Sequence, residues 1–166
     1  MKGPLPFDPI ARAAQLWEDR IGPSTTMAAV TGLMRVQQIL QSAVDAALKP
    51  HGLTFARFEA LTLLSFSRHA RLPMRVMGER LQLHPTSVTN IVDRLEKDGL
   101  VKRQPHPTDR RTTLVEITEE GNARREQATK AVTDIDFGLT GLTDRQTEQL
   151  TELLTRVRKA AGDFTD

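Results

Sequence analysis

The sequence predicts a mainly α-helical protein with a small β-hairpin wing, arranged as a winged helix-turn-helix flanked by N- and C-terminal dimerisation helices. Apolar residues recur at helical spacing through most of the 166 residues. Two short helical segments, opened by Pro73 and Pro85, are separated by three residues, as in a helix-turn-helix. A β-branched run at 112–118 then interrupts the helical pattern and predicts a hairpin.

The N-terminal part predicts two consecutive helices. Asp8 followed by Pro9 is typical of a helix start, an N-cap and then a proline in the first helical position. Gly22-Pro23 ends this helix, and residues 24–26 begin a longer one that runs to the Lys49-Pro50 break. The first helix carries the chain's single tryptophan at its centre.

The middle of the chain predicts three further helices that supply a core. Thr54 caps the first of them, whose core-facing residues are Phe55, Phe58, Leu61 and Leu64. The helices that begin at Pro73 and Pro85 follow, and Gly99 ends the second of them.

The hairpin and two C-terminal helices complete the predicted fold. Residues 100–104 and 112–118 are the candidate strands. Thr118 caps a helix that is weak in apolar residues, and Thr143 with Gln146 forms the capping box of the last helix. We expect three regions: an N-terminal extension helix at 1–22, a helical dimerisation region at 23–53 and 118–166, and the winged helix-turn-helix at 54–117.

Composition limits the classes of function. Cysteine is absent, which excludes disulfides, thiolate metal sites and cysteine-based redox sensing. The chain has no long apolar run and no signal-peptide pattern, so we expect a cytoplasmic protein without a membrane partner. The net charge is only +2, but residues 100–111 carry four cations against one acid, whereas residues 134–166 are acidic. A basic middle favours a polyanionic partner.

The helix from Pro85 to Asp98 has two contrasting faces. Its apolar stripe consists of Val88, Ile91, Val92 and Leu95. The opposite face and its flanks carry Thr86, Ser87, Thr89, Asn90 and Arg94. Asparagine pairs with adenine in the major groove of DNA, arginine pairs with guanine, and a threonine methyl contacts thymine. Taken alone, this helix fits a DNA-reading helix and an ordinary amphipathic surface helix about equally well.

The predicted wing carries Asp109, Arg110 and Arg111 near its tip. A two-stranded wing can place an arginine in the minor groove beside the recognition helix, where narrow A·T tracts concentrate negative potential. Asp109 can orient such a guanidinium by bidentate pairing. The alternative is a solvated turn whose charges contribute little.

The stretch "LHPTSVTNIVDRLEKDGLVKRQPHPTDRRTTLVEITEEG", residues 83–121, resembles the multiple-antibiotic-resistance regulator (MarR) family. The resemblance is strong over residues 54–121 and looser elsewhere. It implies a DNA-binding regulator, most often a ligand-responsive repressor, with Arg111 as the minor-groove arginine and Arg110 as a phosphate contact. It also implies a homodimer, which can read two halves of a pseudo-palindromic operator.

The resemblance further implies a small aromatic or anionic effector. In a urate-responsive subgroup the site is built from a tryptophan, an acid and two arginines. Trp17 and Arg103 match two of these by position, Glu59 replaces the usual aspartate, and Asn90 stands where an arginine is expected. Trp17 can equally be a core residue, and Arg103 can equally contact phosphate.

Other classes of function have less support. The four histidines lack the spacing of a zinc site, and we expect no cofactor. No nucleophile motif or glycine-rich phosphate loop indicates an enzyme. A winged-helix module that binds another protein, without DNA, is the alternative function. That function calls for an apolar groove beside the recognition helix.

Overall fold

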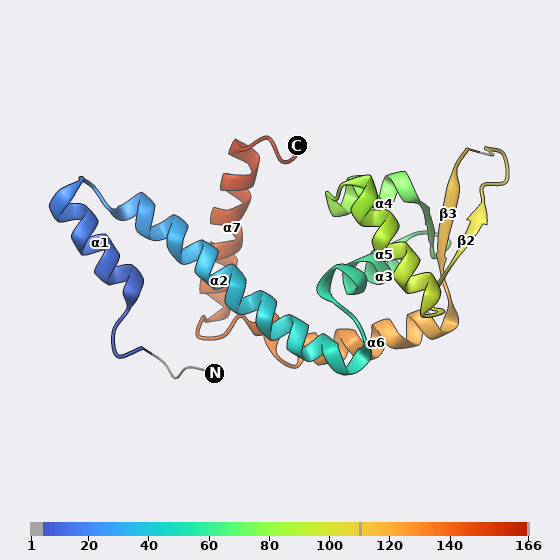
Figure 1. Cartoon of the computed structure of the whole chain (residues 1–166), viewed down its shortest axis with the longest axis horizontal. Helices are drawn as coiled ribbons and strands as arrows, with labels where there is room; N and C mark the ends of the chain where they lie inside the picture. The colour runs from blue at the N-terminus through green and yellow to red at the C-terminus, as the bar shows by residue number, and fades with distance from the viewer. Residues whose placement is uncertain (1–4, 110, 166) are drawn as a thin grey trace.

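A winged-helix region and a set of long helices occupy opposite ends of the molecule in the computed structural model, which describes residues 5–109 and 111–165 (Figure 1). The predicted fold class is confirmed, since the structure is mostly helical with a small antiparallel sheet. In chain order the elements are α1 (Pro9–Arg20), α2 (Thr25–Leu48), η1 (Lys49–His51), α3 (Phe55–Phe66), β1 (Arg71–Pro73), α4 (Met74–Leu81), α5 (Pro85–Lys97), β2 (Val101–Pro105), β3 (Thr113–Ile117), α6 (Glu119–Thr133), η2 (Asp136–Gly138) and α7 (Asp144–Ala160).

The two N-terminal helices begin close to the predicted positions. The Asp8 carboxylate accepts hydrogen bonds from the amides of Ile10 and Ala11 and so caps α1. Ser24 precedes α2, but its side chain makes no cap to that helix. Its amide donates instead to Glu18 of α1 at 3.0 Å, and its hydroxyl bonds to the same carboxylate. The serine therefore fixes the corner between α1 and α2.

The hydrophobic core lies in the winged-helix region and at the helix ends that meet it. Three of the four residues predicted to face a core from α3 are buried, and Phe55 is half-buried at its edge. Thr54 precedes α3 without a side-chain cap, since the Phe55 amide donates to the Asp45 carboxylate of α2 at 3.3 Å. The largest fully buried side chains are Leu48, Leu61, Leu64, Met77, Leu95, Leu100, Val88, Val92, Val115 and Val132.

The sheet has three strands in the order β1-β3-β2, where the sequence predicts two. The predicted hairpin strands are present, each within one or two residues of its expected bounds. The missed strand β1 pairs antiparallel to β3 through Leu72, which lies opposite Val115. Its three residues are too few to show an alternating pattern, and Pro73 at its end suggests a helix start. Only the pairing with a distant segment makes it a strand.

Helix α6 begins where Thr118 caps it, as predicted, and packs close to the start of the wing. The Thr118 hydroxyl accepts from the Gly121 amide at 3.0 Å and donates to the Gly99 carbonyl at 2.8 Å. A β-carbon at Gly121 would lie 2.0 Å from the Leu100 carbonyl oxygen, so only glycine fits there. This close approach explains why the first turn of α6 carries a glycine at position 121.

The last helix begins with the predicted capping box, in which the Thr143 and Gln146 side chains each accept from the other's backbone amide. Unlike α3 or α5, α7 has no buried residue. Within residues 5–109 and 111–165, no helix is both long enough and apolar enough to cross a membrane.

Candidate nucleic-acid interface

Helix α5 divides into a buried and an exposed face as the sequence predicts. Val88, Val92 and Leu95 are at most 2% exposed, and they pack into the core. The five candidate DNA-reading residues of this helix are all exposed, and they are Thr86, Ser87, Thr89, Asn90 and Arg94. Burial of the apolar stripe against α3 and α4 therefore fixes these polar side chains on the outer surface.

The start of α5 is capped within the chain. The His84 imidazole caps the helix, because its Nδ1 accepts from the Thr86 amide at 3.3 Å. The Thr89 hydroxyl donates to the Pro85 carbonyl at 3.0 Å, which leaves the threonine methyl as an apolar contact for a base. The positive end of the helix dipole at this terminus attracts a phosphate.

The turn of the wing is organised by Asp109. Its carboxylate accepts from the Arg111 amide at 2.9 Å and from the Thr112 hydroxyl at 2.6 Å. The bond from Thr112, followed by the bond from Arg111, lowers the pKa of Asp109 below its ordinary value. The His106 amide donates to the Thr112 carbonyl at 3.1 Å and closes the hairpin.

The predicted role of Asp109 needs a correction. The sequence suggested that Asp109 orients a neighbouring guanidinium; within the described parts of the chain, its carboxylate forms no ion pair with that of Arg111. Asp109 instead holds the backbone of the turn, and the exposed Arg111 side chain extends from it. Arg110, the other predicted wing arginine, lies outside the described residues.

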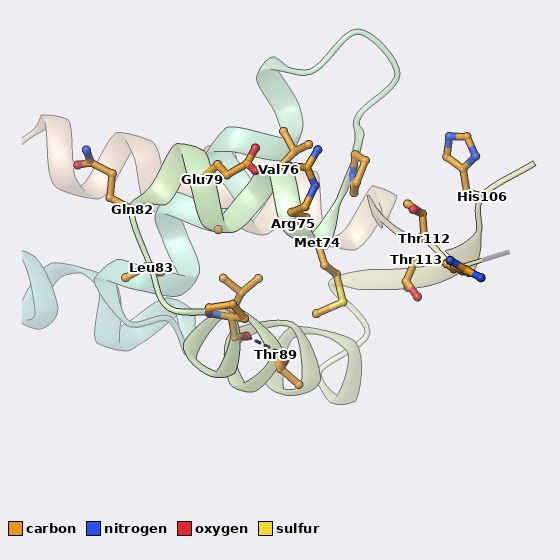
Figure 2. Close-up of a pocket in the computed structure, with 15 residues that line it drawn as sticks. Met74, Arg75, Val76, Glu79, Gln82, Leu83, Thr89, His106, Thr112 and Thr113 are labelled. Carbon is orange, nitrogen blue, oxygen red and sulfur yellow. Dashed lines mark hydrogen bonds and ion pairs between the residues drawn. The ribbon is translucent and has the colours of Figure 1, made fainter. Parts of the chain in front are cut away.

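A groove of about 940 Å³ joins the recognition helix to the wing. Figure 2 shows Thr89 of α5 on one side, His106, Thr112 and Thr113 of the wing on another, and Arg75 of α4 between them. Arg111 also lines it. Arg75 is held by an ion pair to Glu79 one helical turn away. The surface therefore runs without a break from the start of α5 to the exposed arginine of the wing.

Known proteins share both this sequence and this architecture. The MarR family model matches residues 51–112. The transcriptional regulator MhqR of Bacillus subtilis is 31% identical over 133 residues, which cover 80% of this chain and 90% of that protein. The crystal structure of Sco5413 of Streptomyces coelicolor, a MarR family transcriptional regulator, is similar to this fold with a TM-score of 0.78. The similarity covers 86% of this chain and 99% of that chain, and the sequences are 49% identical.

The chain belongs to the MarR family. A further solved structure, a mutant of Escherichia coli MarR complexed with operator DNA, is 26% identical and covers 86% of this chain and 97% of that chain with a TM-score of 0.71. As a member of this family, the protein is a DNA-binding transcriptional regulator.

Arg103, expected in an effector site, links the wing of this MarR family protein to its recognition helix. Its guanidinium donates to Asp93 at 2.5 Å and forms a second ion pair with Glu96, both on α5. The Glu96 carboxylate also accepts from the Arg103 amide at 3.0 Å. Two carboxylates already bind this guanidinium, so the geometry favours a positioning role over anion binding.

The other two expected effector residues lie on separate elements. Trp17 is on α1 and 38% exposed, whereas Glu59 is on α3 and half-buried, which raises the pKa of its carboxyl by desolvation. Helix α1 packs on α2 at the far end of the molecule from α3 and β2 (Figure 1). A single chain therefore does not bring Trp17 together with Glu59 and Arg103. Among the residues that the structure describes, no cluster of three or more histidine or acidic side chains could hold a metal ion.

Two residues of this interface are missed by sequence reasoning, namely His84 and His106. Each begins a His-Pro-Thr tripeptide, and each imidazole accepts from the threonine amide two residues later at 3.3 Å. The repeated tripeptide is the signal that marks both as capping residues.

Proposed function

We propose that the protein represses transcription as a homodimer that covers a pseudo-palindromic operator in the cytoplasm. The observation that carries the proposal is that Thr89, on the exposed polar face of α5, and the exposed Arg111 of the wing border the same groove. Helix α5 reads bases in the major groove, and Arg111 enters the flanking minor groove. Arg110 contacts a phosphate. Asp109 holds the turn of the wing from which Arg111 extends.

The dimer is supported by the apolar surface of the long helices. Exposed fractions on α2 and α7 reach 46% for Leu33, 58% for Leu153 and 63% for Val157. An apolar groove of about 850 Å³ runs between these helices. Exposed apolar surface of this extent is typical of an interface between subunits. Residues 23–53 and 118–166 form the dimerisation region, residues 1–22 an extension of it, and residues 54–117 the DNA-binding region.

Repression is relieved in this proposal by a small aromatic or anionic effector. An effector that binds between the dimer helices and the winged helix favours one spacing of the two recognition helices over another. Helix α3, which carries the half-buried Glu59, contacts both α2 and α5, and in this proposal Trp17 joins the site from the partner's α1. The chain binds and releases DNA in this function and catalyses no reaction.

The test is binding of the purified protein to the intergenic DNA upstream of its own gene, over a series of salt concentrations. We expect two-fold-symmetric protection from nuclease, and an affinity that falls steeply with salt because counterions are released from phosphates. Trp17 fluorescence is followed while aromatic acids and purines are added, and one class is expected to release the DNA.

The outcome that contradicts this function is the absence of DNA binding at low salt. Capture of a protein ligand by the same surface, with little dependence on salt, would favour the protein-interaction module instead. The groove beside α5 is lined by apolar side chains such as Met74, Val76 and Leu83 as well as by charged ones. The alternative is disfavoured instead by the relatives that share this fold, which are transcriptional regulators.

A further inference from the structure

The C-terminal segment after α7 reaches across to the turn of the helix-turn-helix. The Gln82 side-chain amide donates to the Asp163 carboxylate at 2.7 Å and to the Asp163 carbonyl at 3.3 Å. The two residues are 81 positions apart in the chain. In Figure 1 the C-terminus lies between α7 and α4, the helix that Gln82 follows.

Asp163 is held just as firmly from the side of α7. The Arg158 guanidinium donates through Nε to the second carboxylate oxygen at 2.6 Å and lies 5.2 Å from the centre of the Phe164 ring. The Asp163 amide donates to the Arg158 carbonyl at 3.1 Å, so the segment folds back on the helix end. The bonds from Arg158 and then from Gln82 lower the pKa of Asp163, and its carboxylate is charged at neutral pH.

Gln82 occupies the point that sets the direction of the recognition helix. Its backbone is left-handed, with φ 54° and ψ 42°, and it ends α4. Only Leu83 and His84, the cap of α5, separate it from Pro85. A restraint on Gln82 is therefore transmitted over two residues to the start of α5.

We infer that Gln82 and Asp163 are positioning residues, whose contact fixes the orientation of the recognition helix relative to α7. The consequence for operator recognition rests on the proposed function, since α7 contributes to the dimer there. Because α7 of each subunit lies in the proposed dimer interface, this contact sets the distance between the recognition helices of the two subunits. Without the contact, the winged helix of each subunit can still bind one half-site. The fixed spacing that lets both subunits bind the operator together is lost.

Two variants break the contact from opposite ends. Gln82→Asn shortens the amide while keeping a residue that tolerates left-handed backbone, and Asp163→Ala removes the carboxylate. Gln149→Asn, at an exposed glutamine on α7, is the matched control for a shortened amide. Circular dichroism and thermal unfolding verify that each variant folds.

The first measurement reports the orientation within one chain and needs no DNA. The chain has no cysteine, so Lys97→Cys on α5 and Glu152→Cys on α7 accept two spin labels, and excess unlabelled protein dilutes the labelled chains. Pulsed electron resonance is expected to give one narrow distance for the parent and the control, and broad distributions for both variants. Unchanged widths in the two variants would overturn the inference.

The second measurement separates positioning from direct contact with DNA. Both variants are expected to bind the full upstream operator about threefold to tenfold more weakly, the effect of losing one or two hydrogen bonds. Binding to a duplex with one half-site stays within about twofold of the parent, below the effect of one such bond. An equal loss on the half-site for Asp163→Ala would contradict positioning. Failure of the parent to bind either duplex would count against the proposed function alone, because the label distances are measured without DNA.

Discussion

The tripeptide His-Pro-Thr occurs twice on the side of the molecule that we propose faces DNA, at 84–86 and at 106–108, and the two copies begin different structures. In both copies the imidazole Nδ1 accepts from the threonine amide at 3.3 Å. The first copy opens the recognition helix α5, whereas the second opens the turn of the wing. The same local contact therefore begins two different structures.

Burial of the residues that follow explains the difference. After the first copy come Val88, Val92 and Leu95 at helical spacing, and all three are buried in the core. After the second copy comes Asp109, exposed, which bonds to Thr112 and turns the chain back into β3. A cap satisfies the first amides of a helix, but buried apolar contacts supply most of the stability that continues it.

The largest expected effect comes from removing the burial that distinguishes the first copy. Leu95→Ala deletes a side chain that is 0% exposed, and we expect a loss of about 2–5 kcal/mol in the free energy of unfolding, from lost transfer energy and a cavity. Urea denaturation measures it, with Lys97→Ala at an exposed position of the same helix as control. A loss comparable to that of the control would mean that the cap alone maintains α5.

Arg111→Ala is expected to affect DNA binding and leave the fold unchanged. The wing side chain is exposed, so the free energy of unfolding should stay within about 0.5 kcal/mol of the parent. Operator affinity should fall by about tenfold to a hundredfold, as for loss of a specific arginine contact. Fluorescence anisotropy with labelled operator measures it, and Arg145→Ala, an exposed arginine on α7, is the control. Full affinity in the Arg111 variant would remove the wing from the interface.

The two histidines form a matched pair for comparing the copies. His84→Ala removes the cap of α5 and should lower the free energy of unfolding by about 0.5–1 kcal/mol. His84→Asn, a better N-cap, should restore it. His106→Ala should leave global stability unchanged and weaken DNA binding a few-fold, because it loosens only the wing turn. Equal effects of the two alanine variants on stability would contradict the distinction between the copies.

The smallest effect is a loss of order at the wing turn in acid. The Thr112 and Arg111 hydrogen bonds lower the pKa of Asp109 in the folded protein below its ordinary value of 3.8. The stabilisation is therefore fully present above pH 3.8 and is lost as the pH falls through the lowered pKa. Amide resonances of Arg111 and Thr112 in a titration below about pH 5 report the transition, which Asp109→Asn should abolish. A transition that persists in that variant would assign it to another group.

Much of the fold is predictable because its signals are local. Pro9, Pro85, Thr118 and the Thr143 capping box mark helix starts, and each is confirmed. The exposed face of α5 follows from periodicity alone. The third strand is not predictable, since Leu72 is extended only because Val115 pairs with it 43 residues later.

The candidate site shows the same division. The residue types on α5 and in the wing are compatible with DNA binding, and the family resemblance decides for DNA and adds the role of Arg111. The partners of Arg103 are not predictable, because Asp93 and Glu96 reach it only when β2 folds back beside α5. The sequence suggests that the wing aspartate orients a neighbouring guanidinium, whereas the structure shows that it accepts from the Arg111 amide.

The sequence by itself determined where most of the helices begin, which face of α5 is buried, and that the middle of the chain is basic. These depend on interactions within one or two helical turns. Only the tertiary structure decided the pairing of β1 with β3, the fit of Gly121 against Leu100, and the contact of Gln82 with Asp163. Each joins residues that are distant in sequence, so its geometry exists only after the core has placed both elements.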